Sequence, residues 1–144
     1  MPLSRPRFET SRQATKRFSV LLAADAVVYK GGLVALNSNG FAVPATESNT
    51  LVMAGIAQDN EDNTGGGDGE KRIELWSDEA FKLKNADGNE TLTQADLFQA
   101  CYALDDETVT KTDGGGTRSH AGYVHGLEPD GVWVWIRPDA VNKP

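Results

Sequence analysis

Short apolar runs separated by polar turns make up most of the chain. Residues 72–76 and 81–84 alternate polar and apolar positions, which is typical of half-buried strands. Residues 51–57 form a nearly continuous apolar run that is short enough to be a buried strand. Because turn signals recur about every 8–12 residues, the pattern predicts a mainly β domain, either a small β-barrel or a sandwich.

Glycine, asparagine and proline mark where these strands end. Gly31 and Gly32 predict a tight turn, because glycine adopts positive φ without steric cost, and residues 37–40 predict another. Pro44 either ends its strand or restricts it to a sheet edge. The glycine triplets at 65–67 and 114–116 are interpreted as hairpin loops, because neither has the lysine and flanking helix of a phosphate-binding loop.

One short α-helix is predicted over about residues 93–103. Thr93 can cap it, and Asp96, three residues later, can complete a capping box. Three further residues then fall at helical spacing on one face: Leu97, Cys101 and Leu104. Cys101, the only cysteine of the chain, is therefore expected to be a small core residue.

The charge divides the 144 residues into an extended basic N-terminal arm, 1–17, and a single β-rich domain, 18–144. The arm has five basic residues and one acidic residue, a net charge of +4, whereas the remainder carries -11. An arm of this kind suits docking onto an acidic neighbour, and a disordered soluble tail is the alternative. The candidate contacts are Arg5, Arg7, Arg12, Lys16 and Arg17. Nucleic acid is not expected as a partner, because the acidic body repels phosphate.

No membrane segment or secretion signal is expected. The apolar stretch that begins at Phe18 resembles a signal peptide, but it is short, and Asp25 interrupts the cleavage-site pattern. No run approaches the roughly 20 apolar residues that a membrane span requires.

Residues 59–70 resemble a calcium-binding loop, but Thr64 stands where a glycine is required, so we interpret them as a solvated acidic loop. His120 and His125 are five residues apart, which predicts opposite faces of a strand and poor geometry for one metal ion. The acids at 105–107 lack a catalytic partner, and Ser119 lacks the context of a catalytic triad. We expect no catalytic, cofactor or metal site and no enzymatic activity.

Residues 131–136 place Trp133 and Trp135 on one face of a strand and three aliphatic side chains on the other. Two interpretations stay open. The strand is a central core strand covered on both sides, or the indole face is buried by another subunit, where tryptophan is enriched.

Three stretches resemble the capsid cement, or head decoration, proteins of tailed bacteriophages: residues 24–36 leading to 40–45, residues 52–57 with the acidic loop after them, and residues 105–134. The resemblance implies a compact β-rich structural protein without enzymatic activity. Proteins of this family typically form trimers on the outer capsid surface and clamp neighbouring major capsid subunits after the shell expands.

Several further expectations follow from this resemblance. The protein would be made in the host cytoplasm and located in the virion, with the major capsid protein as its partner and no cofactor. The charge asymmetry adds the hypothesis that the basic arm straps an acidic capsid surface. The alternative is a carbohydrate- or host-surface-binding head fibre module that stacks sugar on Trp133, Trp135 or Tyr123. A small hydrolase is a distant third possibility.

Overall fold

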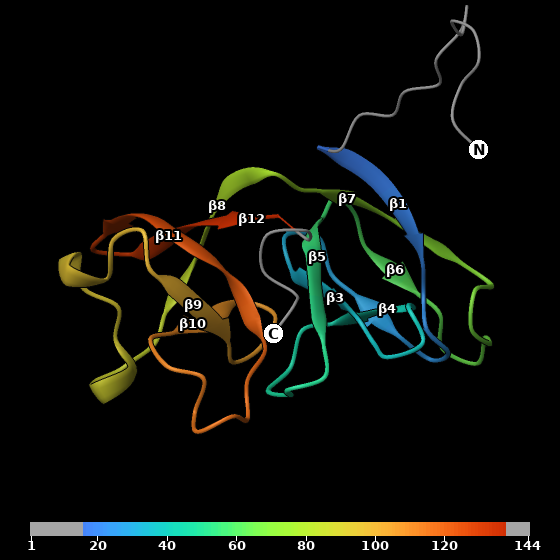
Figure 1. Cartoon of the computed structure of the whole chain (residues 1–144). Coiled ribbons are helices and arrows are strands. Elements are labelled where there is room, and N and C mark those ends of the chain that lie inside the picture. The colour runs from blue at the N-terminus through green and yellow to red at the C-terminus, as the bar shows by residue number, and fades with distance from the viewer. Residues whose placement is uncertain (1–15, 138–144) are drawn as a thin grey trace, which may run out of the picture.

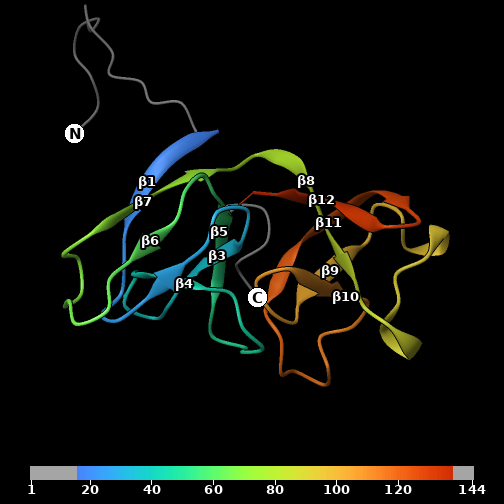
Figure 2. The same ribbon diagram turned by 180° about the vertical axis from the view of Figure 1, so that it is seen from behind.

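The computed structural model describes residues 16–137 as a curled five-stranded sheet beside a closed five-stranded barrel (Figures 1 and 2). The sheet, in spatial order, contains β1 (Arg17–Leu21), β7 (Arg72–Trp76), β5 (Val52–Ala57), β3 (Leu33–Leu36) and β4 (Ala42–Pro44). The barrel, in spatial order, contains β10 (Thr108–Thr110), β8 (Glu79–Asn85), β12 (Gly131–Ile136), β11 (His120–Glu128) and β9 (Ala100–Ala103). A separate ribbon pairs β2 (Val27–Val28) with β6 (Glu61–Asp62). The prediction of a mainly β fold is confirmed.

The sheet and the barrel share one apolar core. Leu33, Met53 and Ile56 of the sheet belong to the same buried cluster as Leu83 and Val124 of the barrel. A second cluster fills the curl of the sheet, where Leu22 makes a parallel bridge to Ala42. The two β units are therefore packed against each other through side chains that water does not reach.

The predicted turns lie where the glycines and asparagine indicated. Gly31 has a φ of 86°, and the amide of Gly32 donates to Tyr29 O at 3.0 Å, which closes the turn after β2. Asn37 and Gly40 close the β3–β4 hairpin through a Gly40 N to Asn37 O bond of 2.9 Å. Pro44 is the last residue of β4, and β4 is an edge strand of the sheet, so both alternatives for Pro44 are confirmed.

The predicted α-helix over 93–103 is wrong. The capping box of Thr93 and Asp96 forms, but it opens only the 3₁₀ turn η2 (Gln94–Asp96), and a second such turn is η1 (Gly88–Glu90). Residues 100–103 are strand β9, which pairs with β10 on one edge and β11 on the other. The barrel closes only through this strand, so its two ladders outweigh the local helix signal. Within residues 16–137 there is no α-helix.

Neither glycine triplet is a hairpin loop. The loop containing Gly114–Gly116 connects β10 to β11, but these strands do not pair, because β9 lies between them. The loop containing Gly65–Gly67 connects β6 to β7, which belong to different sheets. The strand order, which depends on contacts distant in sequence, decided the role of both loops.

The acidic loop 59–70 is more ordered than the prediction of a solvated loop implied. It contains β6, and Asn63 is buried, with its Nδ2 donating to Ala23 O at 2.8 Å and to Gly67 O at 3.1 Å. Two carboxylates accept backbone amides across the loop: Asp68 from Ala24 and Asp25 from Gly65, both at 2.7 Å. These oxygens hold the loop together.

Candidate functional site: an aromatic groove on the barrel

Strand β12 has one face toward the core of the barrel and one face toward the surface. Val132, Val134 and Ile136 are fully buried, whereas Trp133 is 37% exposed and Trp135 is half-buried. The described chain therefore does not cover the strand on both faces, and the core-strand interpretation of the indole face is wrong. Burial of that face by another subunit stays a prediction.

Beside Trp135 the surface is hollowed. One hollow, of about 260 Å³, is lined by Phe98, Tyr123, Val124, His125 and Trp135. A neighbouring hollow of about 530 Å³ shares three of these residues and adds four others: Lys16, Asp78, Glu79 and Ala80. We call the two together the aromatic groove. Its floor is apolar and aromatic, and its rim carries both signs of charge.

Two irregularities in β11 assemble the aromatic side of this groove. The pairing of β11 shifts register between His120 and Gly122 against β9, and between Val124 and Gly126 against β12. A bulge moves later residues to the other face of a strand. The shift after His120 puts Tyr123 on the same outer face as His120, and His125 follows Tyr123 by normal alternation, with buried Val124 between them. The prediction that the two histidines point to opposite faces is wrong for this reason.

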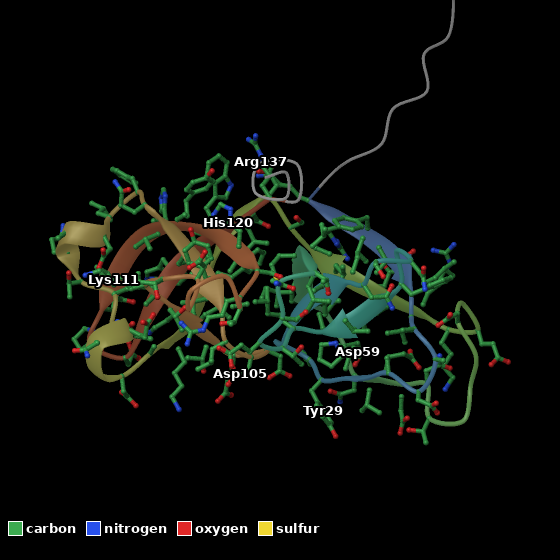
Figure 3. The ribbon with its side chains drawn as sticks, turned by 60° about the horizontal axis from the view of Figure 1, so that its bottom comes forward. Tyr29, Asp59, Asp105, Lys111, His120 and Arg137 are labelled. Carbon is green, nitrogen blue, oxygen red and sulfur yellow. The ribbon has the colours of Figure 1, made fainter. Side chains whose placement is uncertain are left out.

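Ring contacts extend the aromatic surface along the barrel. The ring of His120 lies 5.5 Å from that of Tyr102 and 5.2 Å from that of Tyr123, measured between centroids. His120 Nε2 also lies 3.1 Å from Gly122 O, which fixes the orientation of the imidazole. Figure 3 shows His120 and Arg137 toward one edge of the molecule, with Tyr29, Asp59 and Asp105 toward the opposite edge.

Phe98 is held outward at the mouth of the groove. It has a φ of 65°, and its side chain is 67% exposed. Its amide donates to Val124 O at 2.8 Å, and its ring meets His125 edge-on at 6.3 Å. A bulky residue in the left-handed region costs about 1–2 kcal/mol, so the fold sustains strain to present this ring at the surface.

The indole N–H groups bond within the chain. Trp135 Nε1 donates to Asp78 Oδ1 at 3.2 Å, and Trp133 Nε1 donates to Glu128 Oε2 at 2.9 Å. Arg137 places its guanidinium 4.9 Å from the centre of the Trp135 ring, a cation–π contact. The accessible part of these tryptophans is therefore apolar ring surface, which suits burial against another apolar surface.

An ion cluster borders Trp133. Lys82 Nζ lies 2.6 Å from Asp130 Oδ1 and 3.5 Å from Glu128 Oε2. The hydrogen bond with Asp130 raises the pKa of Lys82, and the same bond lowers the pKa of Asp130. Both groups stay charged at neutral pH, so one end of the aromatic surface has a fixed polar border.

The other candidate clusters have structural roles. Asp105 Oδ1 accepts the amides of Glu107 at 2.9 Å and Thr108 at 2.8 Å, which shapes the turn before β10. The Ser119 hydroxyl bonds to Ser48 O and accepts the amide of Leu51, as part of loop packing. Among residues 16–137, no three His, Cys, Asp or Glu side chains are grouped so as to hold a metal ion. In the same range, no helix is long and apolar enough to cross a membrane.

The predicted contact residues fall in three places. Trp135 and Lys16 line the groove, and Trp133 lies on the same face of β12. Arg17 begins β1, opposite Trp76, and the remaining arm residues, Arg5, Arg7 and Arg12, lie outside the described range. The sequence prediction missed Phe98 and His125, because one lay in the expected helix and the other depends on the bulges.

Comparison of the chain with protein-family models, with curated proteins and with solved structures finds no match.

Proposed function

We propose that this protein is a capsid decoration (cement) protein that binds the outer surface of a phage head as a trimer and stabilises contacts between major capsid subunits. The resemblance of residues 24–57 and 105–134 to that family supports the assignment. The observation that carries it is the aromatic groove, an exposed apolar surface on a barrel whose interior is already filled. Exposed apolar surface of this kind marks an interaction site.

In this proposal the groove is buried between copies of the trimer. Phe98 and the tryptophan rings are the anchors, because aromatic side chains dominate the energy of such interfaces. The barrel and the sheet share a core, so the interface rests on a rigid support. A rigid trimer that contacts several capsid subunits then gains occupancy through avidity, although each contact is modest.

The basic arm supplies the contact with the shell. Its net charge of +4 complements an acidic capsid surface, and Lys16 places the base of the arm at the groove rim. Electrostatic complementarity of this kind speeds association and selects the partner. The proposed activity is structural, and no bond is made or broken.

A head fibre module that binds carbohydrate is the alternative. An aromatic floor with two carboxylates at the rim, Asp78 and Glu79, resembles a surface on which a sugar could stack. However, Asp78 already accepts the Trp135 N–H, and Arg137 covers one side of the Trp135 ring. These contacts favour a protein partner over a sugar.

The test is to add purified protein to expanded capsids that lack it and to measure bound protein by co-sedimentation. We expect saturable binding at a fixed number of copies per capsid. Trp135→Ala and Phe98→Ala should lower occupancy at least tenfold. Tyr29→Ala is the matched control, since Tyr29 is 65% exposed and lies toward the opposite edge of the molecule (Figure 3).

Two results would contradict the proposal. One is a failure of the wild-type protein to bind any shell. The other is full capsid occupancy by both groove variants, which would show that the groove takes no part in the interaction. Binding of the wild-type protein to a glycan array, lost in Trp135→Ala, would establish the carbohydrate alternative.

A further inference from the structure

A third hollow lies over the outer face of strand β10, apart from the aromatic groove. Its volume is about 390 Å³, within the range of about 300–1,000 Å³ that is typical of small-molecule sites. Val109 packs into the barrel core, so Thr108 and Thr110, on either side of it, face outward and line the hollow. None of the described residues lines both this hollow and the aromatic groove. We call it the polar hollow.

The hydroxyl of Thr108 is a buried polar group that the fold leaves without a partner. Thr108 is only 7% exposed, and its amide donates to Asp105 Oδ1 at 2.8 Å, but within residues 16–137 its Oγ1 makes no hydrogen bond. In the same range no side-chain oxygen or nitrogen is both sealed from solvent and unbonded, so this oxygen opens into the hollow. The hydroxyl of Thr110, in contrast, is bonded to Thr112 O at 2.8 Å. A nearly buried group without a partner calls for an explanation, and a ligand supplies one.

Charged side chains of both signs surround this hydroxyl. Lys84 lies opposite Thr108 in the parallel β8–β10 ladder, and its ammonium makes no bond to any described residue. Asp87, which precedes the turn η1, likewise has no side-chain bond in the described chain. Asp105 accepts two backbone amides through Oδ1, so Oδ2 stays open to a ligand. The hollow thus offers an ammonium, two carboxylates and a hydroxyl.

One wall of the polar hollow is a pair of opposite charges. Arg118 Nη1 lies 3.1 Å from Glu90 Oε1, and both side chains line the hollow. Glu90 is also bonded to the hydroxyl of Thr112 at 2.9 Å. Because these two charges balance each other, they leave the open carboxylates and the ammonium to decide which ligand the hollow accepts.

The open groups select a neutral ligand with many hydroxyl groups. Two carboxylates repel an anion, and the ammonium of Lys84 repels a metal ion or an amine. A hydroxyl group of a ligand can donate to a carboxylate and at the same time accept from an ammonium. The hydroxyl of Thr108 can also act in either direction. A sugar ring presents several such hydroxyls on a small neutral frame.

We propose that the polar hollow binds a neutral sugar ring. Lys84 and Thr108 donate to its hydroxyl oxygens, and the carboxylates of Asp87 and Asp105 accept its hydroxyl protons. The hollow has little apolar surface, so hydrogen bonds carry the affinity, and a methyl hexoside should bind with a dissociation constant of about 1 mM. The inference does not depend on the proposed function. It also concerns a different surface from the carbohydrate alternative, because Asp105 lies toward the edge opposite His120 (Figure 3).

An NMR titration of the full-length protein tests the site. The probes are methyl α-glucoside, methyl α-galactoside and methyl α-mannoside. At least one should cause saturable shifts of the amides of Lys84, Asp105 and Thr108, while the indole N–H of Trp135 stays in place. Absence of any saturable shift up to about 50 mM of all three would overturn the proposal. Shifts at Trp135 alone would also overturn it, as would saturable binding of glycine, a zwitterion, by a protein that ignores the sugars.

Thr108→Val separates binding from folding. It replaces the hydroxyl with a methyl group of nearly the same shape, and because that hydroxyl has no partner in the described chain, the urea midpoint should not fall. Sugar binding should weaken at least about tenfold, and Lys84→Met should weaken it likewise. Lys30→Met, at an exposed position that does not line the hollow, is the matched control and should bind as wild type does. Unchanged sugar affinity in both Thr108→Val and Lys84→Met would overturn the assignment.

Discussion

Phe98 places an aromatic ring at the surface of the protein, and its backbone conformation costs stability. Its backbone lies in the left-handed region, where asparagine and glycine are favoured and an aromatic side chain is strained. Its ring is mostly exposed, so burial contributes little to offset that strain. Strain that the fold sustains at an exposed aromatic side chain is typical of a functional position.

Phe98→Asn should therefore stabilise the isolated protein by about 0.5–1 kcal/mol, since asparagine tolerates positive φ. Urea unfolding measures the change. Phe98→Ala is the control, because it removes the ring but keeps the strain and should bring no gain. If the alanine variant were as stable as the asparagine variant, relief of backbone strain at position 98 would not explain the gain in stability.

Cys101 is a core residue, as the sequence predicted, although it lies in β9 rather than in a helix. Its side chain is fully buried, and burial raises the pKa of the thiol from 9.0 to about 12. Since the folded state holds the proton more tightly than the unfolded state, this group stabilises the fold fully below pH 9. That contribution is lost as the pH rises from 9 toward 12.

The wild-type protein should consequently lose about 1.4 kcal/mol between pH 8 and pH 10 relative to Cys101→Ala. Urea unfolding of both proteins at the two pH values checks this. The alanine variant is less stable at every pH because of its cavity, but that loss is independent of pH. Parallel pH profiles for the two proteins would show that the thiol ionises freely in the folded state.

At the scale of elements, a few close contacts determine how loops and strands meet. Arg118 bonds through Nε to Glu47 at 2.9 Å and through Nη1 to Glu90 at 3.1 Å, and its side chain is 14% exposed. Its Nη1 also donates to Thr112 O at 3.2 Å. The glycine loop before β11 is thereby fixed to the β4–β5 loop of the sheet through Glu47 and to the turn η1 through Glu90.

Arg118→Met should destabilise the protein by about 1–2 kcal/mol, because it removes a largely buried cation together with its bonds to Glu90, to exposed Glu47 and to Thr112 O. The free energy of unfolding, obtained from the midpoint and the slope of the urea transition, measures this loss. Lys71→Met is the control, since Lys71 is 50% exposed and lies 3.7 Å from Glu61. That exposed pair should contribute less than about 0.5 kcal/mol.

Gly55 is required where β5 runs beside β7 in the sheet. A Cβ at this position would lie 2.2 Å from Trp76 O, a backbone atom that cannot move aside alone. Gly55→Ala should therefore cost about 3 kcal/mol in thermal or urea unfolding. Gly126→Ala is the matched strand control, because its nearest neighbour would be a Trp133 side-chain atom at 3.5 Å. Equal losses in the two variants would contradict a steric cause.

For the whole molecule, charge separation and the aromatic groove are the two features that bear on assembly. The acidic body and the basic arm are distinct in the sequence alone. The groove exists only because β8, β11 and β12 bring their outer faces together beside Lys16. Its position at the base of the arm joins the two features at one place on the surface.

Neutralising the arm should weaken binding to capsids without changing the fold. The five-fold variant replaces each cation with glutamine: Arg5, Arg7, Arg12, Lys16 and Arg17. We expect occupancy to fall at least tenfold in 0.15 M salt, while the urea midpoint is nearly unchanged. Lys30→Gln with Lys111→Gln, on exposed positions of the body, is the control. Unchanged occupancy would exclude the arm as the strap.

The sequence alone was enough to predict the mainly β fold, the tight turns and the buried strand at 51–57, because period-two alternation and glycine turns are local signals. It also shows the charge difference between residues 1–17 and the rest of the chain, and it predicted the core position of Cys101 and the alternating faces of residues 131–136. The folded structure was needed to show that residues 100–103 are a strand, that both glycine triplets lie in loops between strands that do not pair, and that Phe98 and His125 lie beside Trp135. Those outcomes depend on barrel closure and on bulges, which arise from pairing between residues far apart in the chain.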